Sequence, residues 1–166
     1  MSKYEHCYLP TPVGEIEIKV IPEAKVMLSK GTGSYFKQAN NLFRVLFKEL
    51  NANNLAMTVP VEANIHDAEM RFYVASSDKD RVNTATQSQA SIATKDKRTV
   101  VSIGLRGSYS LKQYETACGK LNIWLETNHN WVKDGEAYAV YWSGPFTLPF
   151  LKRAEVHQPI RPAHKM

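Results

Sequence analysis

The tripeptide Gly-Ser-Tyr occurs twice in this sequence, at residues 33–35 and 107–109, and the patterns around it recur as well. The two glycines are 107 − 33 = 74 residues apart. At the same offset, Val26 aligns with Val100 before the tripeptide, and Phe47 aligns with Leu121 after it. Two copies are too few for a solenoid, in which three or more repeats stack on one another. The sequence therefore predicts a domain built by internal duplication.

Each tripeptide follows a pair of predicted strands. Residues 14–21 alternate apolar and polar side chains, which is typical of a half-buried strand, and residues 25–30 predict a second strand that forms a hairpin with it. Residues 90–95 and 99–105 predict the corresponding hairpin of the second copy. Glycine lets the backbone leave a strand at angles that other residues avoid, and the serine stands where a helix N-cap accepts amide hydrogen bonds. Four residues of the tripeptides are therefore expected to be structural: Gly33, Tyr35, Gly107 and Tyr109.

After each tripeptide the apolar residues recur at helical spacing, which predicts one helix per copy with a single buried stripe. The stripe of the first helix comprises Phe36, Ala39, Phe43, Phe47 and Leu50, and this helix is expected to end at residues 51–54. The stripe of the second comprises Leu111, Tyr114, Ala117, Cys118, Leu121 and Leu125. The opposite face of the first helix is expected to meet solvent and carries Lys37, Asn41, Arg44 and Lys48.

Further strands are predicted at residues 57–65, 70–75, 137–142 and 152–157. Two copies of hairpin, helix and hairpin predict an α+β fold with pseudo-two-fold internal duplication. Its largely antiparallel strands are expected to form a curved sheet or distorted β-barrel with two helices outside. The length of 166 residues is near the commonest domain size, so a single domain over residues 1–166 is expected, with repeat halves at about 14–76 and 88–160.

Composition narrows the possible partners. The net charge is +5 and the pI is about 9.2, but lysine and arginine are scattered and do not alternate with stacking aromatics, so no nucleic-acid partner is expected. No apolar run is long enough for a membrane span, and the first residues lack a secretory signal. We expect a soluble, cytoplasmic protein, and the oligomeric state is left open.

Catalytic and metal-binding patterns are not evident in the sequence. The five histidines show no HxxH or HExxH spacing, the two cysteines form no CxxC, and no GxSxG or phosphate-binding loop occurs. The sequence therefore predicts a protein that is not an enzyme and has no structural zinc. A single histidine as a haem ligand stays open, and His157 on the last predicted strand is a weak candidate for it.

The segment Trp142 to Phe150 places several large apolar side chains in a proline-stiffened loop. Loops usually expose less apolar surface than this. Two interpretations stay open: the loop closes one end of a barrel, or it covers a flat hydrophobic ligand.

Two motifs resemble those of the SOUL haem-binding proteins. Residues 57–61, Met-Thr-Val-Pro-Val, resemble the family's Met-Thr-x-Pro-Val core, and residues 145–156 resemble its C-terminal Pro-Phe-x-x-Pro-Phe signature, which ends in Arg-Asn-Glu-Val. The resemblance covers about residues 14–160. It implies structural roles for six motif residues: Met57, Thr58, Pro60, Val61, Arg153 and Glu155.

The resemblance also implies a distorted β-barrel related to the bacterial GyrI-like effector-binding domains. It implies haem or another tetrapyrrole bound in a shallow groove between the first helix and the loop before the last strand. The ligand-binding residues carried over in this way are Asn41, Arg44, Lys48, Phe146, Leu148 and Phe150. The family has an apolar outer face on the first helix, whereas this helix carries Arg44 and Lys48 there. These two cations suit the anionic propionates of a porphyrin.

The function implied by the resemblance is a haem or tetrapyrrole carrier or buffer without catalysis. The alternative is a GyrI-like module that binds another small-molecule effector, or a protein, and does not bind haem. An enzyme acting on a small hydrophobic compound would need a nucleophile that the sequence does not mark.

Overall fold

The computed structural model describes residues 5–56, 58–78, 90–143 and 147–164. These residues form two compact units that exchange segments along the chain. The first unit comprises residues 1–8 and 22–96, and the second comprises residues 9–21 and 97–166.

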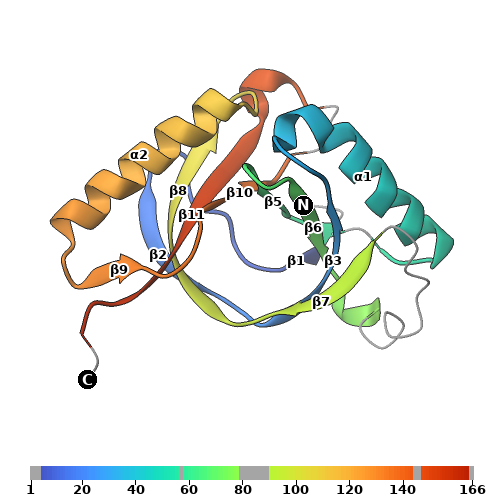
Figure 1. The fold of residues 1–166 in the computed structure, drawn as a ribbon, viewed down its shortest axis with the longest axis horizontal. Helices are drawn as coiled ribbons and strands as arrows, with labels where there is room; N and C mark the ends of the chain where they lie inside the picture. The colour runs from blue at the N-terminus through green and yellow to red at the C-terminus, as the bar shows by residue number, and fades with distance from the viewer. Residues whose placement is uncertain (1–4, 57, 79–89, 144–146, 165–166) are drawn as a thin grey trace. The chain divides into compact units, whose positions relative to one another are not determined.

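The first unit is a four-stranded antiparallel sheet with one helix. Its strand order is β5 (Val61–Asn64), β6 (Glu69–Tyr73), β3 (Ala24–Lys30) and β7 (Ser91–Lys95). Helix α1 (Tyr35–Ala52) contacts β3 and β6 (Figure 1). A small parallel pair, β1 (Glu5–His6) with β4 (Thr58–Val59), and the one-turn helix η1 (Ser76–Asp78) complete this unit.

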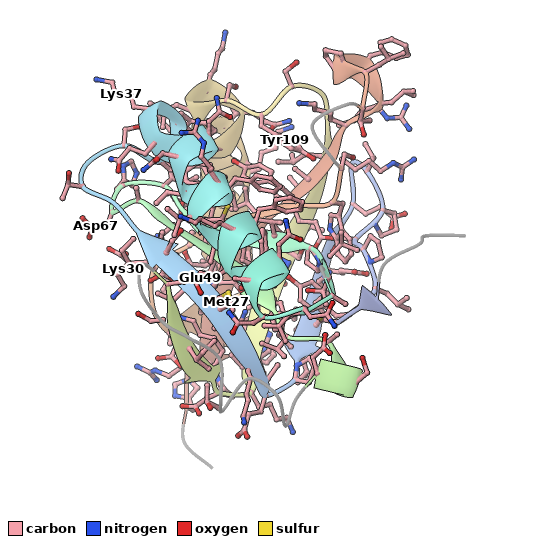
Figure 2. The ribbon with its side chains drawn as sticks, turned by 90° about the vertical axis from the view of Figure 1, so that its right-hand side faces the viewer. Met27, Lys30, Lys37, Glu49, Asp67 and Tyr109 are labelled. Atoms are coloured by element: carbon pink, nitrogen blue, oxygen red, sulfur yellow. The ribbon has the colours of Figure 1, made fainter. Side chains whose placement is uncertain are left out.

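Helix α1 packs on the sheet through a stripe shifted by one position from the expected one. The buried residues of α1 are Tyr35, Leu42, Leu46, Glu49 and Leu50. The predicted stripe is therefore wrong, because Phe36, Ala39 and Phe43 are only half-buried and Phe47 is exposed. Figure 2 shows α1 lying across β3, with Met27 and Glu49 labelled beside each other. The predicted solvent face is confirmed, since all four of its residues are exposed.

The second unit has the same architecture. Its strand order is β2 (Ile16–Ile21), β8 (Arg98–Arg106), β11 (Arg153–Pro162) and β10 (Tyr138–Tyr141), and all neighbours are antiparallel. Helix α2 (Leu111–Thr127) contacts β8 and β11 (Figure 1). The short strand β9 (Trp131–Lys133) pairs with the end of β11, and the one-turn helix η3 (Pro149–Leu151) precedes β11.

The two predicted hairpins are wrong, because β2 is not paired with β3 and β7 is not paired with β8. β2 pairs with β8, and β3 pairs with β7, so each unit takes one strand from the other copy of the repeat. The chain leaves one unit for the other at Ile21–Pro22 and at Asp96–Lys97, where hairpin turns were expected. Strands that are far apart in the sequence are not joined by a tight turn. No local turn signal therefore predicts that they pair.

The duplication itself is confirmed by the strand order. Reading from the edge, β7, β3, β6 and β5 of the first unit correspond to β2, β8, β11 and β10 of the second. Strands β3 and β8 begin 98 − 24 = 74 residues apart, which is the offset found between the tripeptides. Gly33 and Gly107 both have positive φ, +77° and +113°, as expected where the chain leaves a strand for a helix.

The two helices begin differently. Ser34 occupies the N-cap position of α1 but its side chain makes no cap hydrogen bond, whereas α2 is capped by Ser110, whose Oγ accepts from the Gln113 amide at 3.1 Å. Ser108 of the second tripeptide is therefore not the cap, and this prediction is wrong. The cap lies two residues later, and the Tyr109 side chain just before it donates its hydroxyl hydrogen to the Arg153 carbonyl of β11. The stripe of α2 is confirmed at Tyr114, Ala117 and Leu121, whereas Cys118 and Leu125 are half-buried and Leu111 is exposed.

None of the helices in the described part of the chain is both long and apolar enough to cross a bilayer.

Candidate functional site

The outer face of α1 combines an exposed aromatic ring with cations. The name outer face of α1 refers to Asn41, Arg44, Phe47 and Lys48. The other three residues each lie three or four positions from Arg44, so they surround it on one side of the helix. Phe47 is 44% exposed and its ring stacks on that of Phe43, with centroids 5.7 Å apart and planes 14° from parallel. Phe43 in turn meets Phe72 of β6 edge-on at 5.9 Å, so the exposed ring is held from below.

The outer face is electropositive because no carboxylate opposes its cations on the same helix. The acidic residue of α1 is Glu49, which is 6% exposed and accepts a hydrogen bond from the Asn53 amide at 3.3 Å. Lys37, at the first turn, points away from the sheet and adds a further positive charge (Figure 2). A flat aromatic ligand with carboxylates at its edge matches both the ring and the charges of this face.

A buried carboxylate, Glu155 of β11, organises the helix-free face of the second unit. Its Oε1 accepts from Lys19 Nζ at 2.6 Å and Ser102 Oγ at 2.9 Å. Its Oε2 accepts from the Thr11 amide at 2.8 Å and the Trp142 indole at 2.6 Å. These contacts tie β2, β8 and the segment before β2 to the last strand. We call this set of contacts the Glu155 network.

His157 also belongs to the Glu155 network and is fully buried. Its Nε2 lies 2.7 Å from Glu155 Oε1, and its Nδ1 lies 3.0 Å from the Tyr138 hydroxyl. Arg98 Nε donates to that hydroxyl at 2.9 Å, so the tyrosine proton is directed to Nδ1 and Nε2–H donates to Glu155. Both ring nitrogens are thus engaged, and the geometry does not favour His157 as an iron ligand.

The charges around Glu155 keep it ionised. Burial raises the pKa of this carboxyl, but the hydrogen bond and charge of His157, together with Lys19, lower the pKa to about 2. A buried carboxylate with this many hydrogen-bond donors links the segments that supply them.

The first unit holds a second buried charge cluster. Glu62 Oε1 accepts from Arg71 Nε at 2.9 Å, and its Oε2 accepts from the hydroxyls of Tyr8 and Tyr73, each at 2.7 Å. Arg71 also pairs with Glu69 at 2.8 Å, and all three charged groups are buried. This cluster was not predicted from the sequence, because charged residues that alternate with apolar ones along a strand ordinarily face solvent. Opposite charges at alternating positions of neighbouring strands are the signal that could have found it.

The two buried clusters occupy equivalent positions of the duplicated sheets. Arg71 lies opposite Leu28 on β3 and Glu62 on β5. His157 lies opposite Ser102 on β8, 74 residues after Leu28, and opposite Tyr138 on β10. Arg71 and His157 each contact the acidic residue two positions earlier on the same strand. Each also contacts a side-chain oxygen on a neighbouring strand. Both clusters are internally satisfied, which favours scaffold roles over ligand binding.

The other predicted residues lie in several parts of the fold. Leu148 and Phe150 are exposed around η3 in the second unit, and Thr58 and Pro60 are buried in the first unit. Thr58 Oγ1 donates to the Tyr73 carbonyl, Val61 begins β5, and Tyr35 is buried at the start of α1. Arg153 has an exposed side chain at the start of β11. Met57 and Phe146 lie outside the described residues.

Tyr109 holds the second tripeptide to the terminal signature. Its hydroxyl donates to the Arg153 carbonyl at 2.6 Å and accepts from the Ser143 amide at 3.1 Å, and burial raises its pKa. The structural role expected for this tyrosine is consistent with these contacts. Burial also raises the pKa of Cys118, which keeps the thiol protonated and unreactive at neutral pH. No group of three or more potential metal ligands occurs among the residues that the structure describes.

Several solved structures share this fold. The C-terminal domain of EcmrR matches with a TM-score of 0.65 and 16% identity, covering 89% of this chain and 97% of that chain. EcmrR in its complex with DNA matches with a TM-score of 0.68, and this chain spans only 57% of its length. A hydrolase from Listeria innocua matches with a TM-score of 0.60 and 12% identity, covering 91% of this chain and 94% of that chain. These matches confirm the expected α+β, GyrI-like fold.

A comparison with curated protein sequences gives no significant match. The family model described as SOUL heme-binding protein, in contrast, matches residues 3–159, which is nearly the whole chain. This match agrees with the two motifs at residues 57–61 and 145–156 and with the fold of both units. The chain therefore belongs to the SOUL haem-binding protein family.

Proposed function

We propose that this protein binds haem or a related tetrapyrrole on the outer face of α1 and acts as a carrier or buffer without catalysis. The observation that carries the proposal is the exposed Phe47 ring beside Arg44 and Lys48. A porphyrin can stack on the ring, and its propionates can accept charge-assisted hydrogen bonds from the two cations. Asn41 adds an amide at the same face.

Recognition in this proposal depends on the porphyrin ring and its propionates and not on an axial ligand from His157. When bound, haem would supply the spectroscopic and redox properties of its iron. Leu148 and Phe150, with Phe146, are proposed as a separate apolar wall for a hydrophobic ligand, and the exposure of the first two supports this.

The proposed absence of catalysis is supported by the arrangement of the Glu155 network. His157 is paired with a glutamate and a tyrosine, and Ser102 donates to the same glutamate. A nucleophile would need to meet a base directly.

Hemin titration followed by absorbance is the test of this proposal. We expect a saturable Soret shift at micromolar protein, and similar affinity for iron-free protoporphyrin measured by fluorescence. Arg44→Ala/Lys48→Ala should weaken binding by about tenfold through two lost charge-assisted contacts. Phe47→Ala should weaken it by up to about tenfold through the lost stacking.

The matched control for the titration is Lys37→Ala, which removes a cation from the first turn of the same helix and should leave affinity unchanged. A titration without a saturable shift, or equal losses in Lys37→Ala and Arg44→Ala/Lys48→Ala, would contradict the proposal.

A second candidate, a GyrI-like module for another small-molecule effector, is favoured by the match to SAV2435 in its complex with tetraphenylphosphonium, with a TM-score of 0.50 and 10% identity. That match covers 89% of this chain and 94% of that chain. The positive outer face of α1 disfavours a lipophilic cation there. Thermal-shift screening with anionic and cationic aromatic compounds separates the candidates, because a ligand at 100 times its Kd stabilises the folded state by about 2.7 kcal/mol.

A further inference from the structure

The turn before the last strand displays three apolar side chains to solvent. We call Leu148, Phe150 and Leu151 the apolar tip, and their exposed fractions are 55%, 65% and 52%. Contiguous exposed apolar side chains on a soluble domain usually mark an interaction site. The apolar tip belongs entirely to the second unit.

The backbone holds the apolar tip in place, so its exposure is not the result of a loose loop. The Leu151 amide donates to the Leu148 carbonyl at 2.9 Å, and the Lys152 amide donates to the Pro149 carbonyl at 3.2 Å. At the base of the turn, the Gly107 amide donates to the Lys152 carbonyl at 2.9 Å. The turn therefore has its own hydrogen bonds and presents its side chains outward.

Cations surround the base of the apolar tip. Arg106 at the end of β8 lies directly opposite Arg153 at the start of β11, and both side chains are exposed. Lys152 stands beside them, with Nζ 5.0 Å from the centre of the Tyr109 ring. We call Arg106, Lys152 and Arg153 the basic collar. Like charges directly opposite each other on two strands destabilise a sheet, and an external anion would offset this repulsion.

No acidic residue neutralises the basic collar from the adjoining sequence. Residues 104–114 and 147–154 contain no aspartate or glutamate. Glu155, the nearest carboxylate in sequence, is buried and bound to Lys19 and His157. The tip and collar thus combine apolar side chains at the end with positive charge behind them.

We propose that the apolar tip and the basic collar form a docking surface for an anionic lipid bilayer. Phenylalanine and leucine side chains enter the boundary between headgroups and acyl chains, and lysine and arginine a few ångströms behind them meet lipid phosphates. The apolar and the electrostatic contributions together give a larger membrane-binding free energy than either gives alone. Stable but reversible membrane attachment requires both. This docking goes beyond the proposed haem binding on α1 because it depends on the basic collar and Leu151, although it shares Leu148 and Phe150 with the proposed apolar wall.

The test is co-flotation of the full chain with vesicles of phosphatidylcholine, with and without phosphatidylserine. We expect binding to the anionic vesicles only, weakened by added salt. Arg106→Gln/Lys152→Gln removes two cations and should weaken binding by about thirtyfold. Phe150→Ser/Leu151→Ser should weaken it by at least about tenfold.

The matched control is Lys133→Gln/Arg161→Gln, which removes the same charge at the other end of β11. Arg161 is eight residues from Arg153 along that strand, about 27 Å away, and its neighbour Ile160 is paired with Lys133. The control should bind vesicles like the original chain, and Arg106→Lys/Lys152→Arg should retain binding.

Three outcomes would overturn the docking proposal: no binding to anionic vesicles, equal binding to neutral vesicles, or equal losses in the control pair. All substituted side chains are exposed or half-exposed, and circular dichroism verifies that the variants fold. Hemin titration of Arg106→Gln/Lys152→Gln should be unchanged, and Arg44→Ala/Lys48→Ala should still bind vesicles. Failure of one proposal is therefore distinguishable from failure of the other.

Discussion

Glu155 shows how a single side chain stabilises this fold. Its two oxygens accept from a lysine, a histidine, a serine, an indole and a backbone amide, and together these donors come from four separate segments of the second unit. Burying a charge is costly unless it is paired and hydrogen-bonded. Here every donor is in place, so the ionised carboxylate is the favoured form.

We expect Glu155 to make the stability of the protein depend on acid pH. Its folded pKa of about 2 lies below the ordinary value of 4.5, so its contribution is complete above about pH 4.5 and is lost as the pH falls towards 2. The difference corresponds to about 3 kcal/mol. Urea unfolding measured between these pH values should show that the free energy of unfolding of the original chain falls as the pH falls. Glu155→Gln should show a smaller pH dependence, and it should also be less stable at neutral pH.

Glu15→Gln is the control for Glu155→Gln, because Glu15 is exposed and should leave the pH dependence as it is. Equal slopes of unfolding free energy against pH in the original chain and Glu155→Gln would show that Glu155 is not the group that titrates.

The duplicated helices differ in how their first turns are stabilised, although their sequences repeat. Both begin after a glycine with positive φ, yet only Ser110 of α2 makes a side-chain cap bond. An N-cap side chain satisfies an amide that otherwise has no partner in the helix, and it commonly stabilises a protein by about 1 kcal/mol.

We therefore expect Ser110→Ala to lower the free energy of unfolding by about 1 kcal/mol. Ser34→Ala, at the equivalent start of α1, should have a much smaller effect because no cap bond is lost. Urea denaturation of the two variants measures the difference. Equal decreases in the free energy of unfolding of Ser110→Ala and Ser34→Ala would contradict this difference between the two caps.

The sequence predicts the helices well and their buried faces less well. Helical periodicity and the end signal at Asn53 locate α1 correctly, but two overlapping apolar stripes are possible in this helix. Phe43 and Phe47 have the larger side chains, while Leu42 and Leu46 are the residues that the sheet covers. Periodicity alone cannot choose between neighbouring stripes, because the choice is set by tertiary packing. The exposed ring of Phe47, on which the proposed site depends, was therefore not predictable from the sequence.

At the scale of the whole molecule, the exchange of strands between the two copies is the main feature that the sequence does not reveal. Strand alternation predicts β2, β3, β7 and β8 individually, but their pairing depends on contacts between residues 63 to 87 positions apart. The duplication is predictable from the repeated tripeptide, the α+β class from strand and helix periodicity, and the family from the motifs at residues 57–61 and 145–156. The buried clusters around Glu62 and Glu155 are not, since alternating charged residues ordinarily face solvent.

Strand exchange predicts that neither copy of the repeat folds alone. A fragment of residues 14–76 lacks β7 and β8, which are the partners of β3 and β2. We expect this fragment and the fragment of residues 88–160 to lack cooperative unfolding when measured separately by circular dichroism. Their equimolar mixture should regain it, because each supplies the strand that the other needs. A cooperatively folded fragment 14–76 would contradict this expectation.

The crossing of the chain at Ile21–Pro22 also has a consequence for synthesis on the ribosome. β2 leaves the ribosome early, but its partner β8 begins 98 − 21 = 77 residues after β2 ends. At about 5–20 residues per second, the delay is roughly 4 to 15 seconds. During this interval the backbone N–H and C=O groups of β2 that later pair with β8 are available to other chains. Fast translation or a bound chaperone should therefore raise the yield of folded protein, whereas pausing between β2 and β8 should lower it.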